Sequence, residues 1–265
     1  MKKLIDIMSN EYIKKLDALN FEIKKRVSQN NYSGNRISNA KGNSMDFSDF
    51  KNYTFGDDLR RIDWSSFARL DKLFTKLYHE ERQISVNIFL DKSISMEIYD
   101  EKAIYSKQLA ASIAYIAMKN SERINLYTFS QDLNDMKKGI SGKASFFEVM
   151  KFLDNIKYEG KTYINNLFNK GTTFERGISI IISDVFSLDG YENAIKFLKY
   201  NKQEVILVQI LHKEESHPSI SGPIKLIDSE TGEAFEIEVG NTEIENYKKA
   251  LKQYQSCLLY TSRCV

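Results

Sequence analysis

Apolar positions recur at helical spacing near the start of the chain. Within residues 3–27, steps of three and four separate Ile5, Met8, Tyr12, Leu16, Leu19, Ile23 and Val27. This spacing predicts a helix with one apolar face. We expect the face to dock on its own domain rather than on a partner. Residues 30–45 are rich in Asn, Ser and Gly, which indicates a loop or an irregular hairpin.

From residue 84 onward, short apolar runs alternate with amphipathic segments. Helices are predicted at 101–120, 143–156, 163–170 and 190–201, between strands at 84–90, 123–130, 177–184 and 204–211. This alternation predicts an α/β fold with a mostly parallel, Rossmann-like sheet and helices on both faces. After the last strand, the pattern predicts a hairpin (224–228 and 235–239) with Gly232 in its turn, then a helix at 242–255.

Composition narrows the class of protein. The 265 residues are 42% hydrophobic and 28% charged, as in an ordinary soluble globular protein. No apolar run approaches the roughly 20 residues that a membrane-spanning helix needs. The N-terminus lacks the apolar core of a signal peptide, so we expect a cytoplasmic protein. The formal net charge of +2 gives no reason to expect nucleic acid, and a disulfide framework is excluded because the only cysteines are Cys257 and Cys264.

Acids and hydroxyls follow the predicted strands. Asp91, Ser93 and Ser95 come directly after the first regular strand, Thr162 lies in a loop before a helix, and Asp184 ends a later strand. Ligands of open α/β sheets bind at the carboxyl ends of the strands. Oxygen ligands suit a hard cation, so we expect Mg²⁺, or else Mn²⁺ or Ca²⁺. The simpler interpretation is that these side chains only cap helices.

This set resembles the metal-ion-dependent adhesion site of von Willebrand factor A-type domains, which is D-x-S-x-S, a Thr and an Asp. The resemblance implies that Ser93 and Ser95 bind the metal directly and that Thr162 binds directly or through water. Asp91 and Asp184 would act largely through water. Such a metal stays electrophilic, so a carboxylate from a protein partner can complete its shell.

A second stretch, residues 46–83, carries closely spaced charges around the only tryptophan, Trp64. Gly56 indicates a turn, and arginines lie near Asp57, Asp58 and Asp63. The local pattern predicts a salt-bridged corner that buries Trp64 against the α/β core, rather than a direct ligand or partner site.

The same stretch resembles the hallmark of the bacterial and archaeal family called domain of unknown function 58. Asp46, Lys51 and Phe55 stand where that family usually has Glu, Arg and Pro. The resemblance covers almost the whole chain and implies segments 1–82 (N-terminal helix and extension packed on the core), 83–256 (the von Willebrand factor A-like domain) and 257–265 (a tail). We expect this tail to depart from the helix pattern and to be truncated or non-native. The matching hallmark residues are Gly56, Asp57, Asp58, Arg60, Asp63, Trp64, Arg69, Glu81 and Arg82.

The favoured function is therefore a non-enzymatic, metal-dependent adaptor. The resemblance implies a MoxR-type AAA+ ATPase as partner, in the assembly or maturation of other complexes. The chain has no Walker-type phosphate-binding motif, so the partner would supply any ATP hydrolysis. Two alternatives stay open: a metal-dependent phosphohydrolase with Asp91 as nucleophile, and a nucleic-acid binder that uses the aromatic and basic residues of the N-terminal third.

Overall fold

The chain forms two compact units. The computed structural model describes residues 4–19, 46–79, 84–164, 174–187, 190–229 and 232–264. The first unit comprises residues 1–28 and 84–265, and the second comprises residues 29–83. The N-terminal helices thus belong to the same unit as the sheet, whereas the family resemblance implies a single segment of residues 1–82.

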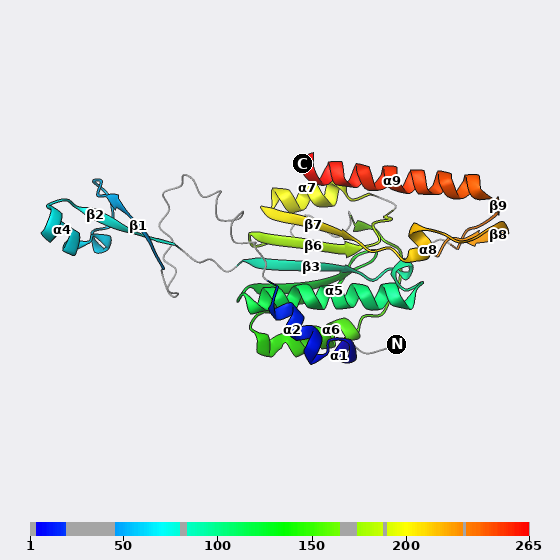
Figure 1. The fold of residues 1–265 in the computed structure, drawn as a ribbon, viewed down its shortest axis with the longest axis horizontal. Coiled ribbons are helices and arrows are strands. Elements are labelled where there is room, and N and C mark those ends of the chain that lie inside the picture. Colours follow the sequence, from blue (N-terminus) through cyan, green and yellow to red (C-terminus); the bar gives the residue numbers. More distant parts are fainter. Residues whose placement is uncertain are drawn as a thin grey trace. The chain divides into compact units, whose positions relative to one another are not determined.

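The first unit is built on a five-stranded sheet in the order β5-β4-β3-β6-β7. Figure 1 shows β3, β6 and β7 of this sheet side by side. All neighbouring pairs are parallel except β4 and β5. The predicted mostly parallel α/β sheet is therefore confirmed. The strands are β3 (Ser85–Asp91), β4 (Arg123–Phe129), β5 (Leu133–Ile140), β6 (Gly177–Ser183) and β7 (Gln203–Gln209).

Helices cover both faces of this sheet, as predicted (Figure 1). One face packs against α5 (Asp100–Lys119) and α6 (Phe146–Asp154), together with the N-terminal helices α1 (Leu4–Ile7) and α2 (Asn10–Asp17). The other face packs against α7 (Glu192–Tyr200) and contacts Leu258 of α9 (Asn241–Cys264).

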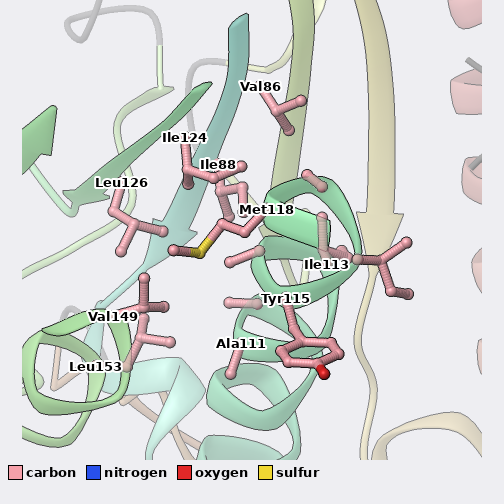
Figure 2. Close-up of a cluster of buried hydrophobic side chains, with 14 of the residues drawn as sticks. Val86, Ile88, Ala111, Ile113, Tyr115, Met118, Ile124, Leu126, Val149 and Leu153 are labelled. Atoms are coloured by element: carbon pink, nitrogen blue, oxygen red, sulfur yellow. The ribbon is translucent and has the colours of Figure 1, made fainter. Parts of the chain in front are cut away.

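The larger core cluster joins β3 and β4 to α5 and α6 (Figure 2). Ile88 of β3 and Val149 of α6 have no exposed surface. Phe89 points to the opposite face, because side chains alternate along a strand, and its ring stacks on Tyr127 with centroids 4.7 Å apart. Strand β3 is buried along its whole length, which gives Asp91 at its end a firmly held position.

The N-terminal segment forms two helices instead of the one predicted. Ser9 separates them, and its side chain accepts a hydrogen bond from Tyr12 N, which caps α2. Met8 and Leu16 of the predicted face are buried in the main core, and Tyr12 packs against it. Ile5 and Leu19 are exposed, so docking on its own domain is confirmed for part of the face. The predicted part from residue 20 to 27 lies outside the described residues.

Beyond β7 come α8 (Lys213–Ser216) and the predicted hairpin of β8 (Gly222–Ile227) and β9 (Ala234–Val239). Helix α9 then continues to Cys264, so the expectation that residues 257–265 depart from the helix pattern is wrong. None of the helices in the described ranges is long and apolar enough to cross a membrane. The helix predicted at 163–170 falls mostly outside these ranges.

The second unit is a small antiparallel ribbon with helical turns between its strands. Strand β1 (Asp46–Asn52) pairs with β2 (Phe74–His79). Between them lie η1 (Leu59–Arg61) and α4 (Trp64–Leu70). The loop or hairpin predicted at 30–45 lies outside the described residues.

Candidate metal centre

The carboxyl ends of β3 and β6 lie side by side because the two strands are adjacent and parallel. Asp91 is the last residue of β3, and Asp184 directly follows β6. The chain after Asp91 carries Ser93 and Ser95 into a 3-10 turn, η2 (Ile94–Met96), before α5 begins. Two carboxylates and two hydroxyls thus come from two neighbouring strand ends.

Thr162 reaches the same place from the loop that follows α6. Glu159 N donates to Lys92 O (2.8 Å), and Ile94 N donates to Gly160 O (3.2 Å). Gly160 has a φ of +77°, which a residue with a side chain adopts only at a cost. These contacts fix the loop against the turn after β3 and bring the buried Thr162 to the strand end.

Asp91 is fully buried and both of its carboxylate oxygens are engaged. Its Oδ1 accepts from Ser93 N at 2.9 Å. Its Oδ2 accepts from Ser183 Oγ at 2.6 Å and from Thr162 Oγ1 at 3.3 Å. Ser183 in turn contacts Tyr191 through a hydroxyl–hydroxyl hydrogen bond of 2.8 Å.

The electrostatics of Asp91 are unfavourable for a carboxylate. Burial, followed by the nearby charge of Asp184, raises the pKa of Asp91 to about 7, against the lowering effect of the Ser183 hydrogen bond. A buried carboxylate with a raised pKa next to a second carboxylate marks a candidate functional site.

Asp184 closes the network from the other strand. Its Oδ2 accepts from Ser95 Oγ at 2.7 Å, and its Oδ1 accepts from Phe186 N at 3.1 Å. The hydroxyls of Ser93 and Ser95 lie 3.0 Å apart. The structure therefore brings all five predicted residues into one connected hydrogen-bond network, in which Asp91–Thr162 and Ser95–Asp184 are direct side-chain contacts.

Three further residues belong to this network, and sequence reasoning missed them. Lys102 Nζ lies 3.1 Å from Asp184 Oδ2 and 2.8 Å from Glu215 Oε1. Ser183 bonds directly to Asp91. Ser183 had a readable signal, because it immediately precedes Asp184 at a strand end. Lys102 and Glu215 had none, since lysines and glutamates near helix starts are usually solvated.

The donor set fits a hard cation. The three hydroxyls and two carboxylates are all oxygen ligands of the kind that Mg²⁺ accepts while keeping waters. The ammonium of Lys102 on Asp184 is already a cation at the edge of the set. Within the described ranges, no three His, Cys, Asp or Glu side chains form a metal-ligand group, so a metal here would depend on the hydroxyls.

The hallmark acids of the second unit make local contacts. Asp57 pairs with Lys51 at 2.7 Å and accepts from Thr54 N, and these hydrogen bonds lower the pKa of Asp57 to about 2. Asp63 accepts from Ser66 Oγ at 2.6 Å and lies 3.3 Å from Lys76 Nζ.

These contacts differ in part from the salt-bridged corner predicted from the sequence. The ion pairs described for Asp57 and Asp63 come from lysines rather than arginines, while Arg69 Nε donates to a backbone carbonyl. Trp64 is 62% exposed, so its own unit does not bury it, and its packing against the α/β core stays a prediction. The ring packs edge-on against Phe67 of the same short helix, whose length leaves little surface to cover an indole.

Other hallmark residues have local backbone roles. Gly56 has a φ of +103°, which explains the glycine in the turn. Asp58 caps η1 by accepting from Arg60 N at 3.0 Å. Glu81 and Arg82 lie outside the described residues.

The fold and the candidate metal centre define the class of protein. It is an α/β protein with a cluster of oxygen ligands where β3 and β6 end. The profile of the family described as "Protein of unknown function DUF58" matches residues 49–256, and the chain belongs to that family. The family predicted from the sequence motifs is thus confirmed. No curated protein matches the chain in sequence.

Two solved structures resemble parts of the chain. One is an aerotolerance-related membrane protein from Bacteroides fragilis, 16% identical, with a TM-score of 0.41 over 63% of this chain and 87% of that one. The other is the conserved hypothetical protein BatB from Bacteroides thetaiotaomicron, 16% identical, with a TM-score of 0.40 over 64% of this chain and 87% of that one.

Proposed function

We propose that this protein is a non-enzymatic, metal-dependent docking module of the von Willebrand factor A type. The observation that carries the proposal is the connected network of Asp91, Ser93, Ser95, Thr162 and Asp184 at one sheet edge. Mg²⁺ would lie against the hydroxyls of this network, with Mn²⁺ and Ca²⁺ as substitutes.

The balance of donors favours docking. Three of the five side chains are neutral hydroxyls, so a divalent ion held mainly by them keeps much of its positive charge. Such an ion attracts a carboxylate from outside, which is a binding chemistry without bond breaking. Ser95 is half-buried, so the network reaches the surface at this point.

The surroundings of the network support a protein partner. Ile94 follows Ser93 and is 41% exposed, Ile98 lies one turn further and is 51% exposed, and Phe186 follows Asp184 by two residues and is 41% exposed. Exposed apolar side chains near a candidate site are a feature of surfaces that bind a protein partner.

The same geometry argues against the phosphohydrolase. A nucleophilic Asp91 would need a free oxygen aimed at a substrate. Both of its oxygens instead accept hydrogen bonds within the fold, and the side chain is fully buried.

We infer the partner from the family: a MoxR-type AAA+ ATPase in the cytoplasm, for which this chain is an adaptor in the assembly or maturation of other complexes. Binding of the purified ATPase to the immobilised protein tests this, with Mg²⁺ and with a chelator. We expect binding with Mg²⁺ that both the chelator and Ser93→Ala abolish. Ser216→Ala, on α8 and outside the network, is the matched control and should bind as wild type.

Binding that survives both the chelator and Ser93→Ala would show that the contact does not use the metal. Turnover of a generic aryl phosphate that is lost in Asp91→Ala would favour the hydrolase instead.

A further inference from the structure

Lys102 is a buried cation that the proposed docking chemistry does not use. It lies in the first turn of α5, and its side chain has no exposed surface. Lysines are almost never fully buried unless they are paired, because removing the ammonium from water is costly. Its partners therefore indicate what it does.

The ammonium has three acceptors. Nζ donates to Ser95 O at 3.0 Å, to Asp184 Oδ2 at 3.1 Å and to Glu215 Oε1 at 2.8 Å. Two of these acceptors belong to residues of the candidate metal centre. The third, Glu215, lies on α8, where its Oε2 also accepts from His212 N at 2.6 Å.

The ammonium of Lys102 shares an acceptor with a hydroxyl of the candidate metal centre. Asp184 Oδ2 is also the oxygen that accepts from Ser95 Oγ at 2.7 Å. The positive charge of Lys102 thus lies on the same carboxylate oxygen as a hydroxyl proposed to bind the metal. A divalent ion at these hydroxyls would meet a fixed positive charge only a few ångströms away.

We propose that Lys102 is a built-in competitor of the divalent ion, which neutralises Asp184 and sets the centre to bind metal weakly. The inference rests on the proposed metal-dependent function and deepens it. A centre weakened in this way needs an added anionic ligand, such as a partner carboxylate, to hold its metal firmly. Glu215 and the backbone carbonyl of Ser95 remain as acceptors of the ammonium, so Lys102 stays paired when the ion takes Asp184.

The test is the affinity for Mg²⁺ and for Mn²⁺, each measured alone by titration calorimetry without a partner. Lys102→Met and Lys102→Gln remove the charge and keep most of the length. We expect both to bind the ions at least about tenfold more tightly than wild type, because a like charge at close range acts strongly inside a protein. Lys102→Arg keeps the charge and should show no such gain.

Lys107→Met is the matched control. Lys107 is buried on the same helix, but its Nζ donates to Ile156 O, away from the candidate centre. Its replacement should leave the affinity within about threefold of wild type. Asp184→Ala, made in the Lys102→Met background, should bind neither ion, which would show that the tighter binding of Lys102→Met is at this centre.

The outcomes separate the two claims. If wild type binds and the neutral Lys102 variants bind equally or more weakly, or do not fold, Lys102 is a structural partner of Asp184 and this inference is wrong. If Lys102→Arg gains as much as Lys102→Met, charge is not the cause, and the inference is equally wrong. If neither wild type nor any folded variant binds either ion, the proposed metal-dependent function itself fails. Binding by the neutral variants alone would support both claims.

Discussion

Replacing the buried carboxylate Asp91 with an amide should stabilise the protein at neutral and alkaline pH. Asp91→Asn keeps the size and one oxygen that accepts from Ser93 N, while it removes the charge. The pKa of Asp91 is raised from 3.8 to about 7 by burial and by Asp184. A shift of about three units corresponds to roughly 4 kcal/mol of stability lost by keeping the group ionised.

The direction in which stability changes with pH follows from the protons that Asp91 binds in the folded and unfolded states. Between pH 4 and pH 7 the folded protein holds a proton on Asp91 that the unfolded chain has released. The free energy of unfolding therefore falls as pH rises through this range, and the penalty is constant above it. The amide loses part of the acceptor role toward Ser183 and Thr162, worth about 1 kcal/mol per hydrogen bond. We expect a net gain of about 2–3 kcal/mol at pH 8 and no gain near pH 4.

Urea unfolding of wild type and Asp91→Asn at pH 4.5, 6 and 8, in chelator, measures this difference. Asp132→Asn, at an exposed position outside the network, controls for the change in net charge and should leave stability unchanged. Added Mg²⁺ should stabilise wild type and not Asp91→Asn. If Asp91→Asn is no more stable than wild type at pH 8, or if the difference does not vary with pH, the reasoning about an uncompensated buried charge is wrong.

Two other substitutions test the packing of the sheet and the hydrogen bonds around the candidate metal centre. Gly177→Ala should lower the free energy of unfolding by several kcal/mol in chemical unfolding, because the added Cβ would lie 1.9 Å from Ser85 O on the neighbouring strand. Gly240→Ala is the control and should have a mild effect, because its Cβ would meet only a flexible side chain at 3.0 Å. Ser183→Ala removes a hydrogen bond that lowers the pKa of Asp91, so it should raise that pKa further. We expect Mg²⁺ binding to weaken severalfold in calorimetry. Unchanged binding would show that Ser183 has no part in holding the metal.

Much of the fold followed from periodicity. Four strands were predictable because β3, β4, β6 and β7 are short apolar runs between helical patterns. Strand β5 was missed, since it lies at the sheet edge and most of its described side chains are exposed, which leaves a polar sequence. The break at Ser9 was missed because a cap interrupts a helix without interrupting its apolar spacing.

The candidate centre was predictable only in part. Asp91 and Asp184 could be placed together because parallel strands end at the same edge of a sheet. Lys102 and Glu215 are 113 positions apart in sequence. Local residue spacing therefore cannot predict that they pair. The exposure of Trp64 was likewise hidden, because an aromatic residue among charges is compatible with a buried corner and with an open surface.

We propose above that the sheet edge where β3 and β6 end binds a divalent ion. Titration of Mg²⁺ and of Mn²⁺ into wild type, Asp91→Ala and Asp184→Ala tests it most directly, with thermal unfolding of each protein as a check of folding. We expect wild type to bind one ion and neither folded variant to bind any. Equal binding by all three proteins would contradict it, and Asp91 would then be no more than a buried cap at the end of a strand.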